Sequence, residues 1–336
     1  MLAQHFHLLF LPQLASTRVA ILVLALLLDA CVGDPPWLFR WLPHPVAVIG
    51  RAVRSFDRRL NVSQRSFAVR RVRGILVTIF LGMTALALGI AISAGLGYIR
   101  HGWLVEMLLV TVLVAQRDLY DHVVRVMRAL DRDSLEEGRA AVSRIVGRDP
   151  ETLDEYGVAR AGIESLAENF SDGVVGPVLA YVLAGLPGLL FYKTISTLDS
   201  MIGHRDARYQ AFGWASARLD DLLNLLPARL SALMLTIASA FVPKTRPFQA
   251  LITMWQDARK HRSPNAGWPE SAMAGALGVS LGGPRRYGGV VIADPWLGTG
   301  RARATPHDMR RALMVFVVAC ILQLGLLSGL ALLLTA

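Results

Sequence analysis

Three carboxylates recur at helical spacing in one segment of the chain. Glu164, Glu168 and Asp172 stand four residues apart, with Asn169 beside the second, and an apolar stretch follows them. On an α-helix these side chains would share one face. Like charges on one face repel each other, and oxygen ligands suit a divalent cation such as Mg²⁺. The spacing therefore predicts a metal site, and the alternative is a solvated acidic face paired with arginines such as Arg160.

A second polar segment lies between two apolar runs, at 193–221. It contains Lys193, Asp199, His204 and Arg205. A lysine and an arginine could bind phosphate, whereas an aspartate or a histidine could accept a proton. The alternative is a polar connector between two membrane segments.

Two proline-containing motifs follow the first apolar run. Asp34 lies in Gly-Asp-Pro-Pro-Trp, and His44 lies in Pro-His-Pro-Val. Proline restricts the backbone to extended conformations, which would hold both side chains near the bilayer surface, where they could act in catalysis. The alternative is a surface turn anchored by Trp37 and Trp41.

A fourth motif, Ser-Pro-Asn-x-Gly-x-Pro-Glu, carries Asn265 and Glu270, and a glycine-rich stretch with Arg285 and Arg286 follows it. Small residues let backbone N–H groups approach an anion, and arginines add positive charge. These four residues are predicted to bind substrate or phosphate; the alternative is an ordinary surface loop. Neither the Gly-x4-Gly-Lys nor the Gly-x-Gly-x-x-Gly nucleotide motif occurs in the sequence.

The composition indicates the elements that must position these residues. Hydrophobic residues make up 54% of the 336 residues and charged residues only 18%, against about 25% charged in soluble domains. This excludes a disordered chain and argues against an ordinary soluble protein. A membrane span needs about 20 apolar residues, and apolar runs lie at 19–32, 74–99, 103–115, 174–192, 222–242 and 313–335.

The predicted fold class is therefore all-α: a single integral membrane domain over 1–336, with about four to six membrane segments and helical cytoplasmic loops. Glycines and prolines interrupt 174–192, so that run is either a kinked span or two half-helices. The runs 74–99 and 103–115 are expected to form a hairpin around Arg100-His101-Gly102.

The charge distribution predicts the orientation. The net charge is +10, and arginines are concentrated in 33–73 and 243–312. Basic loops tend to stay in the cytoplasm, so both segments are expected there, as is the insertion 116–173. Within this insertion, apolar positions from Leu119 to Leu130 predict an amphipathic helix, and Asp149-Pro150-Glu151 predicts the start of another. The basic residues are scattered and no nucleic-acid-binding motif occurs, so no nucleic-acid partner is expected.

The order of the motifs resembles one family. Gly-Asp-Pro, Pro-His-Pro-Val, Glu-x3-Glu-Asn-x2-Asp-Gly, Lys-Thr-x4-Asp-Ser-Met-x-Gly and Ser-Pro-Asn-x-Gly-x-Pro-Glu occur in this order between residues 25 and 300. Together they are similar to the CobD/CbiB family of membrane proteins in cobalamin biosynthesis. The resemblance implies an adenosylcobinamide-phosphate synthase of the cytoplasmic (inner) membrane. Such an enzyme joins a carboxyl group of adenosylcobyric acid to the amine of 1-aminopropan-2-ol phosphate and consumes ATP.

The resemblance implies ATP with Mg²⁺, and a corrinoid that is a substrate rather than a cofactor. The implied partners are both substrates, membrane lipid and other late enzymes of the cobalamin pathway. Within this interpretation the catalytic candidates are Asp34, His44, Asp199 and His204. The candidates for substrate and phosphate are Lys193, Arg205, Asn265, Glu270, Arg285 and Arg286, and those for the metal are Glu164, Glu168, Asn169 and Asp172. The alternatives are a membrane sensor like the ampicillin-resistance signalling protein AmpE, or a transporter with broken helices. The dense polar motifs favour the enzyme.

Overall fold

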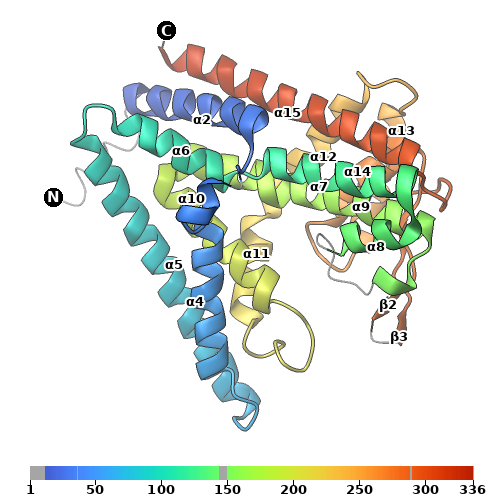
Figure 1. The fold of residues 1–336 in the computed structure, drawn as a ribbon, viewed down its shortest axis with the longest axis horizontal. Helices are drawn as coiled ribbons and strands as arrows, with labels where there is room; N and C mark the ends of the chain where they lie inside the picture. The colour runs from blue at the N-terminus through green and yellow to red at the C-terminus, as the bar shows by residue number, and fades with distance from the viewer. Residues whose placement is uncertain (1–11, 36, 144–149, 288–289, 336) are drawn as a thin grey trace. The chain divides into compact units, whose positions relative to one another are not determined.

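The computed structural model describes residues 12–35, 37–143, 150–287 and 290–335, most of them helical (Figure 1). The chain divides into two compact units. The first unit comprises residues 1–115, 176–223 and 327–336, and the second comprises 116–175 and 224–326.

The first unit is built from long helices with short connections. Two local signals explain where they begin: Pro45 stands at the first helical position after His44, and the Ser66 hydroxyl accepts a hydrogen bond from the Val69 N–H at 3.4 Å. The expected turn around Arg100 is present, because one helix ends at Gly97 and the next begins at Gly102. The described helices are α2 (Pro12–Val32), α3 (Leu38–Trp41), α4 (Pro45–Leu60), α5 (Phe67–Gly97), α6 (Gly102–Leu113), α10 (Gly176–Ile202) and α11 (Trp214–Leu223).

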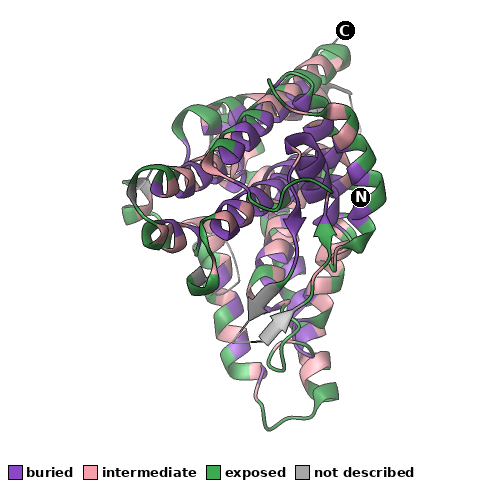
Figure 2. Ribbon diagram, turned by 90° about the vertical axis from the view of Figure 1, so that its right-hand side faces the viewer, coloured by how far each residue is buried: buried purple, intermediate pink, exposed green. Residues whose placement is uncertain are grey.

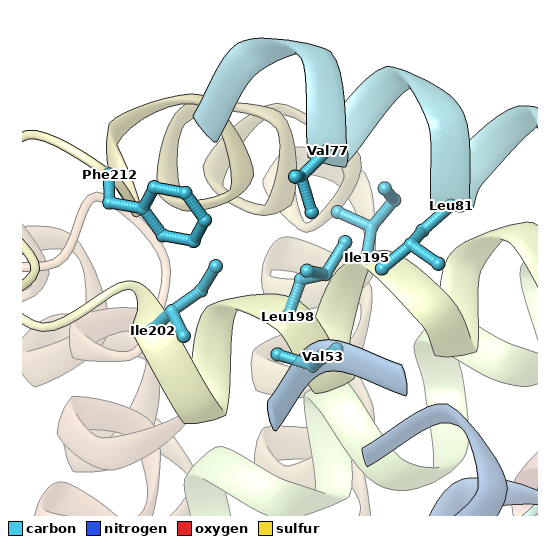
Figure 3. Close-up of a cluster of buried hydrophobic side chains, with 7 residues drawn as sticks. All are labelled: Val53, Val77, Leu81, Ile195, Leu198, Ile202 and Phe212. Atoms are coloured by element: carbon cyan, nitrogen blue, oxygen red, sulfur yellow. The ribbon is translucent and has the colours of Figure 1, made fainter. Parts of the chain in front are cut away.

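A buried hydrophobic cluster joins three of these helices (Figure 3). Ile195, Leu198 and Ile202 on α10 recur at helical spacing and therefore share one face. They pack with side chains of α4, α5 and the loop after α10, namely Val53, Val77, Leu81 and Phe212. The cluster holds the polar end of α10 against α4.

A break interrupts α10 at Gly185, as the glycines and prolines of 174–192 predicted. Gly185 has φ 64° and ψ −155°, and Pro187 follows inside the helix. Only glycine adopts this conformation readily. Gly89 on α5 lies against the break, since a Cβ there would be 2.5 Å from the Pro187 Cα. The observed form is a kinked helix.

The second unit combines helices with four short strands. Its helical elements are α7 (Gln116–Arg128), η1 (Ala129–Asp133), α8 (Leu135–Val142), η2 (Pro150–Thr152), α9 (Glu155–Asn169), η3 (Phe170–Val175), α12 (Leu225–Ser239), α13 (Pro247–Asp257), η4 (Ala258–Lys260), α14 (Gly267–Leu277) and the first part of α15 (Pro306–Thr335). The strands are β1 (Leu281–Gly282), β2 (Arg285–Tyr287), β3 (Val290–Ile292) and β4 (Trp296–Leu297). β1 pairs with β4 and β2 with β3, both antiparallel.

All eleven residues of α14 are buried, which makes this helix the centre of the second unit. It packs against α9, α12 and α13. Its small residues allow close approach: a Cβ at Gly275 would lie 2.7 Å from the Ala250 Cα on α13. Buried residues gather inside the molecule, whereas exposed ones line the outer faces of the helices (Figure 2).

Three helical stretches of the described chain are long and apolar enough to cross a membrane: Phe67–Gly97, Glu155–Ile202 and Pro306–Thr335. A bent pair, Trp214–Leu223 with Leu225–Ser239, raises the number to four if it forms one span. The protein is thus an all-α membrane protein, as predicted, with three or four candidate spans where four to six segments were predicted. α6 has only twelve residues, about 18 Å, and is too short to cross alone.

Two details differ from the sequence-based expectations. The pairs of strands between 281 and 297 lie in a segment that has no apolar period, so hydrophobic patterning gave no indication of them. The helix expected to start at Asp149-Pro150-Glu151, of which Asp149 lies outside the described residues, begins later. Pro150–Thr152 forms a 3₁₀ turn, and α9 begins at Glu155 because the Asp154 carboxylate accepts a hydrogen bond from the Gly157 N–H at 2.6 Å.

Candidate functional site

The predicted site residues divide between the two units. Asp34, His44, Lys193, Asp199, His204 and Arg205 belong to the first unit. Glu164, Glu168, Asn169, Asp172, Asn265, Glu270, Arg285 and Arg286 belong to the second.

Asp34 and His44 are brought together at the start of α4. The Asp34 Oδ2 lies 3.3 Å from the His44 Nε2. The His44 Nδ1 accepts a hydrogen bond from the Val46 N–H at 3.2 Å, so Nε2 carries the proton and faces the carboxylate. The Phe39 ring lies 4.7 Å from the imidazole, centroid to centroid. The imidazole is thus held in one orientation from three sides.

The other oxygen of Asp34 is a candidate proton acceptor. Asp34 Oδ1 is buried and has no hydrogen-bond partner among the described residues. A buried acceptor without a donor is costly, and such atoms frequently have a functional role. The His44 Nε2 likewise has no hydrogen-bond partner among the described residues, so its 3.3 Å approach to Oδ2 is an ion-pair contact only.

Asp199 lies in the last turn of α10, where the helix gives way to a loop. Its carboxylate sits against Gly203, where any side chain would overlap Oδ1. The charged groups that act on Asp199 are Asp221 of α11 and His204. Lys193 lies six residues earlier on α10 and is half-buried, whereas His204 and Arg205 are exposed. Sequence reasoning did not select Asp221, although it stood in the polar segment; the packing of α11 on α10 sets its place.

A neighbouring ion pair fixes the loop after α10. Arg208 donates to the buried Asp57 Oδ2 at 2.7 Å, and Asn61 donates to Asp57 Oδ1 at 2.8 Å. The hydrogen bond to Asp57 raises the pKa of the Arg208 guanidinium. The Asp206 carboxylate accepts the N–H groups of Arg208 and Tyr209. These contacts hold the segment that carries His204 and Arg205.

In the second unit the three carboxylates of the predicted stripe have different surroundings. Glu164 is buried, and its Oε1 accepts a hydrogen bond from the Gly282 N–H at 2.8 Å. Glu168 is exposed, and Asp172 is half-buried within the π-helix η3. Asn169 donates back to the Ser165 carbonyl at 2.9 Å. A π-helix advances fewer degrees per residue than an α-helix, so η3 changes the regular register on which the stripe rested.

The described residues contain no group of three His, Cys, Asp or Glu side chains that could hold a metal. A Mg²⁺ bound with ATP needs only one or two carboxylates, because phosphate oxygens and waters complete its shell. The accessible carboxylates of Glu168 and Asp172 fit that requirement. The Glu164 Oε1 also supports β1, and a magnesium site formed by Glu164, Glu168, Asn169 and Asp172 stays a prediction.

The motif around Asn265 forms a compact polar turn before α14. The Ser263 hydroxyl accepts the N–H groups of Asn265 and Ala266, both at 3.2 Å. Asn265 Oδ1 accepts a hydrogen bond from the Arg229 guanidinium at 2.8 Å, and this guanidinium lies over the Trp268 ring at 4.7 Å. The amide of Asn265 therefore holds Arg229 in place.

Glu270 and His261 form a second histidine–carboxylate pair. Glu270 is 2% exposed, on the buried helix α14, and its Oε1 lies 3.8 Å from the His261 Nε2. The His261 Nδ1 accepts the Ser263 N–H at 3.1 Å, which again leaves the proton on Nε2. Sequence reasoning missed His261 and Arg229. The available signal for Arg229 was its place as a lone charge inside the apolar run 222–242.

The backbone of Arg285 and Arg286 forms strand β2, opposite Ile292 and Val291 of β3. Their side chains lie outside what the structure describes, so their assignment to phosphate stays a prediction.

The helical architecture and the long apolar helices define an all-α membrane protein. The family model described as CobD/Cbib protein matches residues 22–316. The chain therefore belongs to the CobD/CbiB family.

Curated relatives are similar over nearly the whole chain. The chain is 49% identical over 330 residues to the cobalamin biosynthesis protein CobD of a Sinorhizobium species, with 95% of this chain and 99% of that protein covered. It is 51% identical to the protein of the same name from Rhizobium meliloti, with 91% and 95% covered. It is 46% identical to that from Rhodobacter capsulatus, with 88% and 92% covered. No solved structure matches the chain.

Proposed function

We propose that this protein is an enzyme of cobalamin biosynthesis, an adenosylcobinamide-phosphate synthase. It would join the free propionate carboxyl of adenosylcobyric acid to the amine of 1-aminopropan-2-ol phosphate with consumption of ATP. The observation that carries the proposal is membership of the CobD/CbiB family over residues 22–316, a range that contains every predicted site residue. The names of the curated relatives support the pathway.

The geometry of Asp34 suits the proton transfer that this reaction needs. An amine attacks only as the free base, so the ammonium group must lose a proton. Asp34 Oδ1 is buried without a donor, and His44 orients the carboxylate through Oδ2. In this proposal Asp34 accepts the proton and His44 positions it. Asp199 with His204 is the second candidate, because its carboxylate lies in the last turn of α10 and His204 follows in the next loop.

Phosphate would be bound by cations, and each unit offers candidates. Lys193 and Arg205 lie in the first unit on either side of Asp199 in sequence. In the second unit Arg229, held by Asn265 and Trp268, joins the predicted Arg285 and Arg286 as a candidate. ATP would supply the activation of the carboxyl group, and Glu168 and Asp172 would hold the accompanying Mg²⁺.

The proposed location is the cytoplasmic membrane, with the basic segments 33–73 and 243–312 on the cytoplasmic side. The spans described above support a membrane location. The positive-inside tendency supports the side.

Growth of a deletion strain tests the proposal. A bacterium that depends on cobalamin and lacks this gene should grow on added cobinamide but not on cobyric acid, and the gene on a plasmid should restore growth on cobyric acid. A sensor would leave growth on both precursors intact. If the protein only imported cobyric acid, a deletion strain that makes cobyric acid inside the cell would grow without the gene.

A purified-protein assay distinguishes an enzyme from a sensor or a transporter. The protein in detergent, with adenosylcobyric acid, ATP, Mg²⁺ and 1-aminopropan-2-ol phosphate, should form the amide, seen by mass spectrometry. The proposal would be contradicted if the folded protein formed no product and the gene also failed to restore growth on cobyric acid.

A further inference from the structure

A groove of about 490 Å³ opens on the second unit, and none of the candidate residues named above lines it. It lies between α7 and α15, and the segment 241–243 after α12 completes its wall (Figure 1 labels both helices). Its lining is mostly apolar, with two arginines and a tyrosine as the polar members. The residues that the argument uses are Tyr120, Arg128, Phe241, Arg310, Met314 and Val317.

The groove follows one face of each helix. The lining residues of α15 recur at Arg310, Leu313, Met314, Val317 and Val318, which is the spacing of a single helical face. From Arg310 to Val318 the helix advances eight residues, about 12 Å. On α7, Tyr120 to Arg128 covers the same length. The groove is therefore elongated along the two helices.

Both arginines lie at the same end of the groove. Arg128 is the last residue of α7, and Asp131 follows in η1. The Arg310 guanidinium lies 3.7 Å from the Asp131 carboxylate, which places Arg310 beside that end of α7. Both side chains of this ion pair are about half exposed. Exposed pairs are weak, so Arg310 can still bind another anion.

The two arginines of the groove lie where the uncharged stretch of α15 begins. After Arg310 and Arg311, the residues from 312 to 336 carry no charge. Arg311 is buried and bonded to Asp308, so Arg310 is the exposed cation nearest the apolar part of the helix. Below it, Met314 and Val317 are each 40% exposed and Phe241 is 67% exposed. The surface thus presents cations at the interface and apolar side chains at membrane depth.

We infer that this groove binds an anionic phospholipid. Its phosphate would lie against Arg128 and Arg310, and an acyl chain would lie along Phe241, Met314 and Val317. The charge distribution favours a lipid over a soluble phosphate, because a small anion would leave the apolar walls of the groove unused. Basic pockets between helices near the membrane surface suit anionic headgroups. The inference goes beyond the proposed activity and does not depend on it.

The test measures lipid binding to the purified full-length protein in detergent, by native mass spectrometry and by thermal unfolding. Phosphatidylglycerol is the probe, phosphatidylcholine tests the charge requirement, and glycerol phosphate tests a soluble phosphate. The protein should retain phosphatidylglycerol and gain thermal stability, with little effect of the other two. Equal binding of phosphatidylcholine, or full competition by glycerol phosphate, would overturn the inference.

Variants locate the site. The double variant Arg128→Gln with Arg310→Gln should bind phosphatidylglycerol roughly 30-fold more weakly, since each cation contributes about a factor of five. Arg125→Gln, an exposed arginine on the same helix outside the lining, is the matched control and should bind normally. Val317→Trp should fill the groove and reduce the binding of phosphatidylglycerol although both arginines are present. If the double variant fails to fold, Val317→Trp decides alone. Normal binding in the folded variants, or an equal loss in Arg125→Gln, would contradict the assignment.

Discussion

The two carboxylate oxygens of Asp34, the proposed proton acceptor, have different surroundings. One oxygen is engaged by His44 at 3.3 Å, and the other is buried without a donor. Desolvation raises the free energy of such an oxygen until a substrate donor arrives. In the proposed reaction, the substrate would supply the hydrogen-bond donor that Oδ1 lacks among the described residues.

Replacing this oxygen tests its role. Asp34→Asn should lower kcat by about 10²–10⁴-fold and should leave folding intact, because the amide keeps the shape of the carboxylate. His44→Gln should have a smaller effect, and it should shift the pH profile of the rate. The measurement is the rate of amide formation against pH. Full activity of a folded Asp34→Asn variant would remove Asp34 from the reaction.

Glu168 and Asp172 carry the magnesium prediction. Glu168→Gln and Asp172→Asn should abolish turnover while expression and membrane insertion stay normal, because both side chains are accessible and removing a like charge relieves repulsion. Amide synthesis and the dependence of the rate on Mg²⁺ concentration provide the check. Normal turnover in both variants would indicate a solvated acidic face.

Glu164 provides the contrast to this pair. Its carboxylate is buried and accepts the Gly282 N–H, so Glu164→Ala leaves a buried donor unpaired and should lower the free energy of unfolding by about 1–3 kcal/mol. Glu164→Gln keeps an acceptor and should lose less. Thermal unfolding in detergent distinguishes the two.

At the scale of elements, glycines set how closely α5 approaches its neighbours. A Cβ at Gly74 would overlap the Phe212 carbonyl oxygen, and one at Gly89 would meet the Pro187 backbone. Because these are main-chain atoms, neither can turn away as a side chain would. Gly74→Ala and Gly89→Ala should therefore destabilise the protein by about 1–3 kcal/mol.

The same helix contains the matched control. Around Gly95 and Gly97 no atom lies within 4 Å of a Cβ position. Gly95→Ala should be neutral or should stabilise by up to about 1 kcal/mol, because alanine favours the helix. Denaturant unfolding of the three variants is the measurement. Equal effects at all three positions would show that backbone contact is not the cause.

α7 carries a pH-sensitive contact. The hydrogen bond from His122 to the Asp118 carboxylate raises the pKa of His122 above 6.5, against partial desolvation and the charge of Arg125. A raised folded pKa stabilises the fold fully below pH 6.5, and the contribution is lost as the pH rises through the raised value. The pair is partly exposed, so the effect should stay below about 1 kcal/mol.

A comparison of variants isolates this contribution. The wild type should exceed His122→Gln in melting temperature at pH 6, and the difference should shrink at pH 9. Asp118→Asn should remove the same pH dependence. A difference that does not change with pH would contradict the assignment to this pair.

For the whole molecule, the distribution of charge determines the expected orientation. The loop 61–66 lies within the basic segment 33–73, and α5 follows with 31 residues, about 46 Å, which is enough to cross the bilayer. A reporter fused in 61–66 should be cytoplasmic, and one in the turn 98–101 should lie outside. A fusion near Gly300 should again be cytoplasmic. Finding 61–66 outside would reverse the topology.

The sequence by itself determined the class of protein and the motifs. The apolar runs predicted an all-α membrane protein because helical spans are local: about 20 apolar residues satisfy their own backbone hydrogen bonds. The hairpin around Arg100, the break in 174–192 and the buried face at Leu119, Val123 and Val126 follow from equally local rules. The order of the motifs predicted the family, which the family match confirms.

Only the tertiary structure decided which polar residues meet. Glu164 accepts an N–H from a residue 118 positions away, and Arg229 meets Asn265 across 36 positions. The helical period placed Glu164, Glu168 and Asp172 on one stripe, but the π-helix η3 and the strand β1 give them separate surroundings. Such contacts depend on how distant segments pack, and spacing along one helix does not contain that information.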